Sequence, residues 1–209
     1  NMLHFIISEN RFPKFIIVIL FIFSSINMFG KMHNDKADFL SQKNNDLVEE
    51  NLRMIDSTIS IAYGLNDKVV LSEAYIEKGN YFLKQRNYNN ALKNFTISKQ
   101  LSTEIKNDFT FYSSQVGIAK TKESLYETKE AILLYEESLL YFEKHKQEAK
   151  SFSIYLSILG KLSYLYSKTN HLNKSDYYNK MELSETVDTI NYQYALKNKG
   201  IIDFYKKDY

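Results

Sequence analysis

The chain has 209 residues, and its 27 basic and 25 acidic residues leave a net charge of only +2. This balance, with no long run of Lys or Arg, gives no reason to expect nucleic-acid binding. The absence of cysteine excludes disulfides, cysteine-ligated zinc and a lipoprotein cysteine, while one proline and six glycines favour a nearly all-helical chain.

The first segment, residues 1–30, contains a short apolar stretch behind a positive flank. Arg11 and Lys14 precede nine uninterrupted apolar residues at 15–23, and smaller and polar residues follow. This order is typical of a secretory signal peptide. The stretch Phe15–Phe29 is shorter than the roughly 20 apolar residues of a spanning helix. An uncleaved N-terminal membrane anchor and a buried N-terminal helix are the alternatives.

This segment also determines the expected location of the protein. A signal peptide or an anchor predicts an exported, periplasmic or membrane-anchored bacterial protein, and the alternative is a cytoplasmic protein with an N-terminal membrane anchor. The polar residues 31–46 lack helical periodicity and are predicted to be a linker.

From residue 47 to residue 209, apolar residues recur at helical spacing. Ala91 is followed by Phe95 and Ser98, and Ala131 is followed by Tyr135 and Ser138 in the same register, while Ser175 opens a weaker third copy. A small residue at such a position lets two helices cross closely. The expected elements are a leading helix or cap at 47–64, helix pairs at 68–86 with 89–106, 109–124 with 128–146 and 149–168 with 173–185, and an incomplete fourth pair from 187.

A second copy of one segment begins near the C-terminus. Residues 78–88 align without gaps on residues 199–209, at an offset of 121. In the first copy another helix follows at once, which suggests that this chain is the front part of a longer protein. Ile201, Ile202 and Phe204 are then expected to be partly uncovered, and downstream repeats or a partner chain would cover them.

At these residues the chain resembles the tetratricopeptide repeat (TPR) family, over about residues 47–209. The first repeat carries Tyr75, Gly79, Phe82, Ala91 and Phe95 at the family's positions. Later repeats depart from the pattern, with Lys122 and Asn179 at aromatic places, no closing proline, and a period above the usual 34 or so. An unrelated helical solenoid is the alternative. The resemblance implies an α-solenoid of antiparallel helix pairs, wound as a right-handed superhelix.

The resemblance also implies a concave groove lined by the first helix of each pair. Carried over by position, the groove residues are Asn80, Lys84, Lys120, Tyr164, Lys168 and Lys197. A basic lining suits an acidic peptide or a C-terminal carboxylate, although Ile76 stands where a full carboxylate clamp has a polar residue. The alternative is that these lysines are ordinary solvated side chains.

No motif for catalysis, a metal or a cofactor is present in the sequence. His4, His33, His145 and His171 are isolated, and there is no phosphate-binding Gly-rich loop or nucleophilic-serine motif. We therefore expect a non-enzymatic scaffold that binds a protein or peptide partner without a cofactor. It resembles the sensory part of a membrane-bound transcriptional regulator or sensor of the Bacteroidetes type. The alternative is a free-standing exported assembly or adaptor protein of the cell envelope.

Overall fold

The computed structural model describes residues 42–43, 46, 48–186 and 189–207, and it divides into two units, Asn1–Asn51 and Leu52–Tyr209. In the first unit the described residues 42, 43, 46 and 48–51 are helical. The predicted signal peptide or anchor lies outside the described residues, as does most of the predicted linker. None of the helices in the described ranges is both long and apolar enough to cross a membrane.

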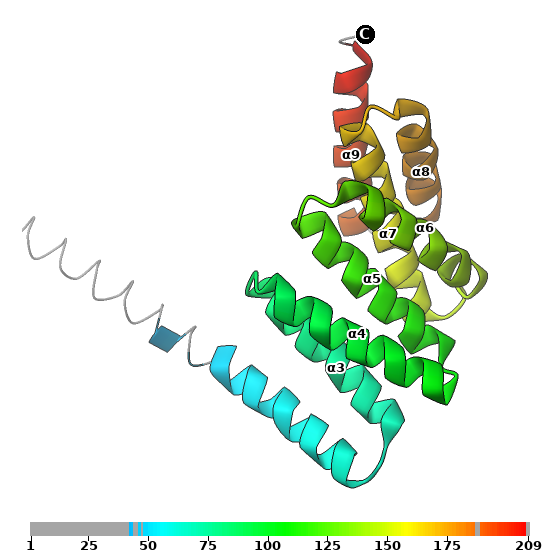
Figure 1. The fold of residues 1–209 in the computed structure, drawn as a ribbon. Coiled ribbons are helices and arrows are strands. Elements are labelled where there is room, and N and C mark those ends of the chain that lie inside the picture. Colours follow the sequence, from blue (N-terminus) through cyan, green and yellow to red (C-terminus); the bar gives the residue numbers. More distant parts are fainter. Residues whose placement is uncertain (1–41, 44–45, 47, 187–188, 208–209) are drawn as a thin grey trace, which may run out of the picture. The chain divides into compact units, whose positions relative to one another are not determined.

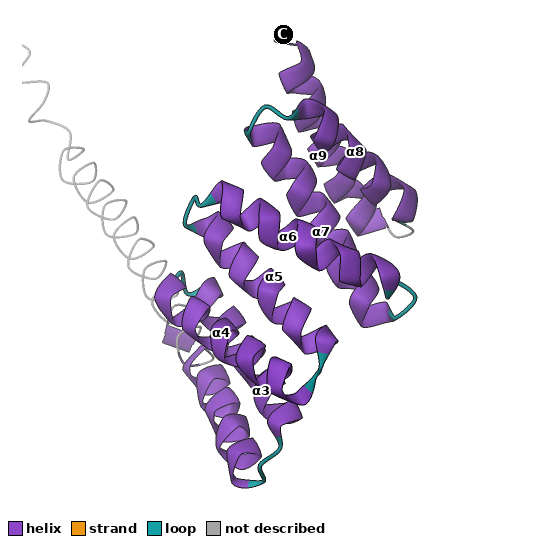
Figure 2. Ribbon diagram, turned by 45° about the vertical axis from the view of Figure 1, so that its right-hand side comes forward, coloured by secondary structure: helices purple, strands orange, loops and turns teal. Residues whose placement is uncertain are grey.

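The second unit consists of helices joined by short turns, and no strand occurs in its described residues (Figures 1 and 2). Each helix packs against the next one along the chain, so the predicted all-α class with consecutive helix pairing is confirmed. Helical residues 52–64 come first, and α3 (Lys68–Lys84), α4 (Tyr88–Ile105), α5 (Asp108–Ser124), α6 (Thr128–Lys144), α7 (Ala149–Lys168), α8 (Leu172–Glu185) and α9 (Thr189–Lys207) follow.

The turns between helices follow a common geometry. Asn66, Arg86, Lys106 and Tyr126 stand 20 residues apart, and each has a positive φ of 54–63°. The residue after each of them donates its backbone N–H to a carbonyl five positions back, as in Asn87 to Phe82 at 2.9 Å. Two of these turns end their helices one or two residues before the predicted positions, α3 at Lys84 instead of 86 and α4 at Ile105 instead of 106, because the left-handed residue stops the helical hydrogen bonds. The helices predicted to end at 64 and 124 end there.

The crossing of α3, α4 and α5 is built around Phe95, which is fully buried. A Cβ added at Gly79 of α3 would lie 2.7 Å from its ring, and one added at Gly117 of α5 would lie 2.4 Å from it. The two glycines therefore give the ring its space. Ala91, one turn earlier on α4, is also fully buried, as expected of a small residue at a helix crossing.

The main apolar core lies among α5, α6, α7 and α8. Its largest buried side chains include Tyr135, Phe142, Tyr155, Leu159 and Leu162. Buried hydroxyls also connect neighbouring helices: Ser98 donates to the Ser72 carbonyl at 2.7 Å, and Ser175 donates to the Ser163 carbonyl at 2.7 Å. Ser98 and Ser175 thus stand at helix crossings with their hydroxyls paired, whereas the buried hydroxyls of Thr110, Ser113, Ser151 and Ser163 have no hydrogen-bond partner among the described residues.

The first helices of the pairs also contact one another. α3 contacts α5, α5 contacts α7, and α7 contacts α9. One prediction for the last helix was wrong: Ile202 is only 1% exposed. It lies two turns from Ala195, whose carbonyl accepts a hydrogen bond from Asn179 of α8, so this side of α9 faces its neighbours. Ile201 is half-buried, and Phe204 is exposed.

Candidate functional site

The carboxyl ends of α3, α5 and α7 come together around a hollow of about 550 Å³, called hollow one. Lys84 and Lys168 are the last residues of α3 and α7, where the negative end of a helix dipole stabilises a cation. Arg86 and Tyr126 join the lining from the turns that follow α3 and α5. The full lining is Leu83, Lys84, Arg86, Tyr88, Glu123, Ser124, Tyr126, Thr128, Tyr164, Leu165 and Lys168.

A second hollow of about 470 Å³, called hollow two, lies between α7 and α9. It shares Tyr164 and Lys168 with hollow one and adds Lys197 from α9. Gly200 and Phe204 are part of its wall. Tyr164 and Lys168 therefore stand at the border between two hollows, one on each side of α7.

The side chains of Tyr164 and Lys168 also interact with each other. The Lys168 ammonium lies 4.8 Å from the centre of the Tyr164 ring. The interaction with Tyr164 raises the pKa of Lys168, so this side chain is a cation at physiological pH. The pair presents an aromatic face and a fixed positive charge side by side.

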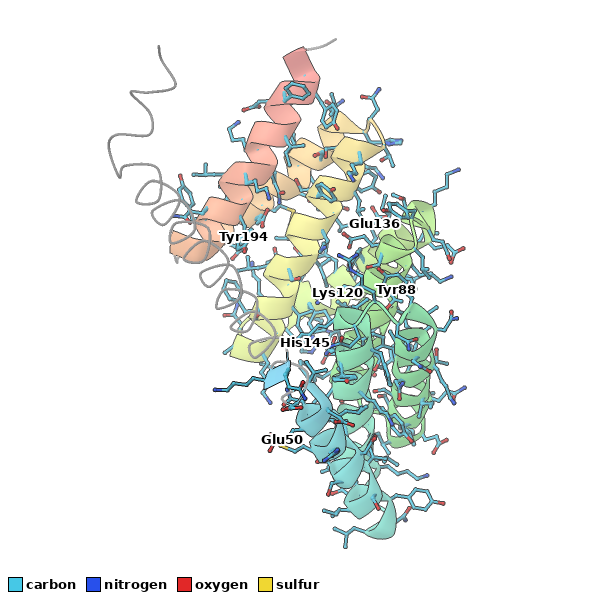
Figure 3. The ribbon with its side chains drawn as sticks, turned by 90° about the vertical axis from the view of Figure 1, so that its left-hand side faces the viewer. Glu50, Tyr88, Lys120, Glu136, His145 and Tyr194 are labelled. Carbon is cyan, nitrogen blue, oxygen red and sulfur yellow. The ribbon has the colours of Figure 1, made fainter. Side chains whose placement is uncertain are left out.

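Four of the six predicted groove residues border these hollows. Lys84, Tyr164 and Lys168 meet in hollow one, and Lys197 joins the last two in hollow two. Asn80 is exposed on α3 and lines neither hollow. Lys120, labelled in Figure 3, is partly buried. Its burial, together with nearby Lys161, lowers its pKa.

Glu123 is the one carboxylate in the lining of hollow one, and its charge is compensated locally. Lys161 of α7 donates to Glu123 Oε1 at 2.8 Å, and the Tyr135 hydroxyl of α6 donates to Oε2 at 3.0 Å. Burial and the Glu123 charge raise the pKa of Tyr135, which keeps its proton as the donor. Lys84, Arg86 and Lys168 consequently give the hollow a positive character.

A third hollow of about 410 Å³ contains groups that the sequence did not single out. Glu182 of α8, only 6% exposed, lies against Gly160 of α7, and Asn198 of α9 donates to its Oε2 at 3.3 Å. Burial raises the pKa of this carboxyl group. Tyr164 and Lys161 also belong to the wall of this hollow. Glu182 lies seven residues, or about two helical turns, after buried Ser175, so both residues are on the same face of α8. This spacing is the sequence signal that could have revealed its burial.

The described part of the chain contains no group of three or more His, Cys, Asp or Glu side chains placed to hold a metal ion. The arrangement of cations, aromatic rings and hollows is suited to binding. Models of known protein families and the sequences of curated proteins were both compared with the chain, and neither comparison gave a match.

Proposed function

We propose that this chain is a non-enzymatic interaction scaffold, a TPR-like α-solenoid that receives an acidic peptide segment of a partner protein. The observation that carries the proposal is the meeting of Lys84, Arg86 and Lys168 with Tyr164 around hollow one. Cations beside aromatic faces attract carboxylates and pack against the peptide's apolar atoms.

The TPR-like, right-handed arrangement is part of the proposal. It is supported by small buried residues at successive crossings, by turns 20 residues apart, and by contacts between successive first helices. In such an array a pair of helices cannot bury its apolar face alone, so adjacent pairs stabilise one another. A hollow shared by α3, α5 and α7 would then be a stable surface rather than a transient gap between loops.

The wider setting is proposed on the resemblance alone. The chain would be the sensory or interaction part of a longer bacterial signalling or transcription-regulatory protein, exported or membrane-anchored through residues 15–29. A free-standing exported adaptor of the cell envelope is the alternative. Fractionation of cells that produce the complete reading frame distinguishes an exported or membrane-bound product from a cytoplasmic one.

Charge reversal in hollow one tests the binding function. The probe is a fluorescein-labelled eight-residue peptide rich in Asp and Glu, and its comparison peptide carries Asn and Gln at the same positions. We expect fluorescence anisotropy to show saturable binding of the acidic peptide only. Lys84→Glu with Lys168→Glu should weaken this binding at least tenfold, because two attractive contacts become repulsive.

The matched control is Lys93→Glu with Lys144→Glu, which reverses two exposed lysines on α4 and α6. It produces the same change in net charge away from hollow one. If both double variants weaken peptide binding equally, the attraction depends only on net charge, and hollow one is rejected as the site. Absence of binding by the parent protein at low salt would reject an acidic peptide as the ligand.

A further inference from the structure

The third hollow, called hollow three, is bordered by α7, α8 and α9 and has a wall that departs from the repeat. In α4 a buried aromatic residue, Phe95, is followed three positions later by buried Ser98, and α6 carries the same kind of pair. The corresponding positions of α8, four and seven residues after the small residue of the crossing, hold Asn179 and Glu182. The third repeat therefore has an amide and a carboxyl group where the first two have an aromatic ring and a hydroxyl.

The facing position of α7 departs from the repeat as well. Gly160 precedes Ser175 by 15 residues, the distance that separates Val116 of α5 from Ala131. A Cβ added at Gly160 would lie 2.7 Å from Oε1 of Glu182, so the carboxylate occupies the space of the missing side chain. The glycine on α7 and the glutamate on α8 thus fit each other, and together they place a carboxylate in the wall of hollow three.

The charge of Glu182 has no cationic partner among the described residues. Its side chain is only 6% exposed, and Asn198 of α9 donates to its Oε2 at 3.3 Å. Lys161, the one basic residue in the wall of hollow three, lies instead 2.8 Å from Oε1 of Glu123. A buried carboxylate that is hydrogen-bonded but not paired with a cation is costly, so a cation that enters the hollow would be stabilised there.

The side of α9 that borders hollow three stays uncovered when further helices follow. The 121-residue offset aligns Tyr194 and Asn198 of α9 with Glu73 and Glu77 of α3. Both of these glutamates are exposed, although α4 and α5 follow α3 and pack against it. A helix that followed α9 in the same manner would pack on its other side and leave hollow three open.

The size and composition of hollow three limit its ligand to one chemical class. Its volume of about 410 Å³ lies at the small end of ligand pockets, which span about 300–1,000 Å³. Glu182 is the one carboxylate in its wall, whereas a Ca²⁺ or Mg²⁺ site needs several oxygen ligands. Tyr164 and Tyr194, the latter labelled in Figure 3, add aromatic rings. One buried anion beside aromatic rings suits an organic cation better than a metal ion.

We propose that hollow three binds a small organic amine, whose primary ammonium group pairs with the Glu182 carboxylate. An ammonium group has three N–H donors. One of them donates to Glu182, and the Ser157 hydroxyl and the Asn198 amide oxygen can accept the others. The organic part of the ligand lies against Tyr164 and Tyr194. Tyr164 is the one wall residue that hollow three shares with hollow one, so amine binding and acidic-peptide binding can each fail alone.

The test uses the 209-residue chain and phenethylamine, which is an ammonium ion at neutral pH. Its neutral counterpart, 2-phenylethanol, has a hydroxyl group in place of the ammonium group. We expect isothermal titration calorimetry to show saturable binding of the amine and much weaker binding of the alcohol. Glu182→Gln keeps the shape of the side chain and removes its charge, so it should weaken amine binding by about tenfold or more.

Two further variants make the result decisive. Gly160→Ala places a methyl group where the carboxylate lies and should also weaken amine binding. Glu143→Gln, at an exposed position of α6, removes the same charge away from hollow three and should leave binding unchanged. Circular dichroism verifies that each variant is folded. Equal affinity of the parent for the amine and the alcohol, unimpaired binding by Glu182→Gln, or no amine binding by the parent overturns the proposal. So does equal weakening by Glu143→Gln.

Discussion

Phe95 of α4 and Gly117 of α5 are in such close contact that a Cβ at position 117 would lie 2.4 Å from ring atom Cε1. Gly79 of α3 also lies against the ring, and an added Cβ there would be 2.7 Å from it. The ring is fully buried, and both glycines lie against its Cδ1 and Cε1 atoms, so a side chain at either position would press on it. The spacing of three helices depends on these two absent side chains.

We therefore expect Gly117→Ala to lower the free energy of unfolding. Overpacking costs about 1–3 kcal/mol, and the better helix propensity of alanine returns at most about 1 kcal/mol. Urea denaturation followed by circular dichroism measures the net loss. Gly200→Ala is the matched control, because it has open space and should be neutral or slightly stabilising. Equal stability of the two variants would show that the ring adapts to the added methyl group.

Sequence reasoning found the helices but not this contact. Ala91, Ala131 and Ser175 were identified by their spacing, and all three are fully buried. Periodicity reports which side of one helix is apolar, so it identifies the crossing residue on that helix. It does not report which ring of a neighbouring helix arrives there. Gly117 was therefore not singled out.

The sequence predicted only part of the candidate site, because the periodicity of one helix does not report its contacts with other helices. Lys84 and Lys168 end their helices and border hollow one, whereas Asn80 lies exposed elsewhere on α3. The pKa of Lys120 is lowered by its burial and by Lys161 of α7, which pairs with Glu123 of α5, and this arrangement depends on how α7 packs. Asn179, read as a departure from an aromatic position, donates to the Ala195 carbonyl at 2.8 Å. Such contacts between helices are not encoded in the period of any single helix.

The left-handed turn residues give a second prediction. Lys106 has φ 55°, a conformation that costs a residue with a Cβ about 1–2 kcal/mol. Lys106→Gly should raise the free energy of unfolding by about 0.5–1 kcal/mol, because part of this relief is lost to the freer unfolded chain. Gln85, an exposed cap residue with φ −79°, is the control, and Gln85→Gly should not stabilise. Chemical denaturation of both variants decides whether turn strain is present.

A third prediction concerns the attachment of α9. Asn179 is 1% exposed and links α8 to α9 through the Ala195 carbonyl. Asn179→Ala removes a buried donor, at a cost of about 1–3 kcal/mol. Hydrogen–deuterium exchange should speed up in α9 more than in α5, since only α9 loses the contact. Asn173→Ala, at an exposed position of α8, is the control. Uniform acceleration in both helices would indicate a loss of global stability instead.

The last prediction is a pH dependence at Glu182. Burial raises the pKa of Glu182 in the folded chain above its pKa in the unfolded chain. At a pH between these two pKa values, the folded chain keeps a proton that the unfolded chain has released. Folding stability from this group therefore falls as the pH rises through that interval, and the buried carboxylate is a cost at pH 7. Glu182→Gln is neutral at every pH and its oxygen still accepts from Asn198.

We expect the stability gain of Glu182→Gln over the parent to be larger at pH 7 than at pH 4, where the parent carboxyl group is protonated. Urea denaturation at several pH values measures this difference. Glu143→Gln, at an exposed position of α6, corrects for the loss of one negative charge. A gain that shrinks toward pH 7 would mean that the amide donors of Asn179 and Asn198 outweigh burial and stabilise the charged form.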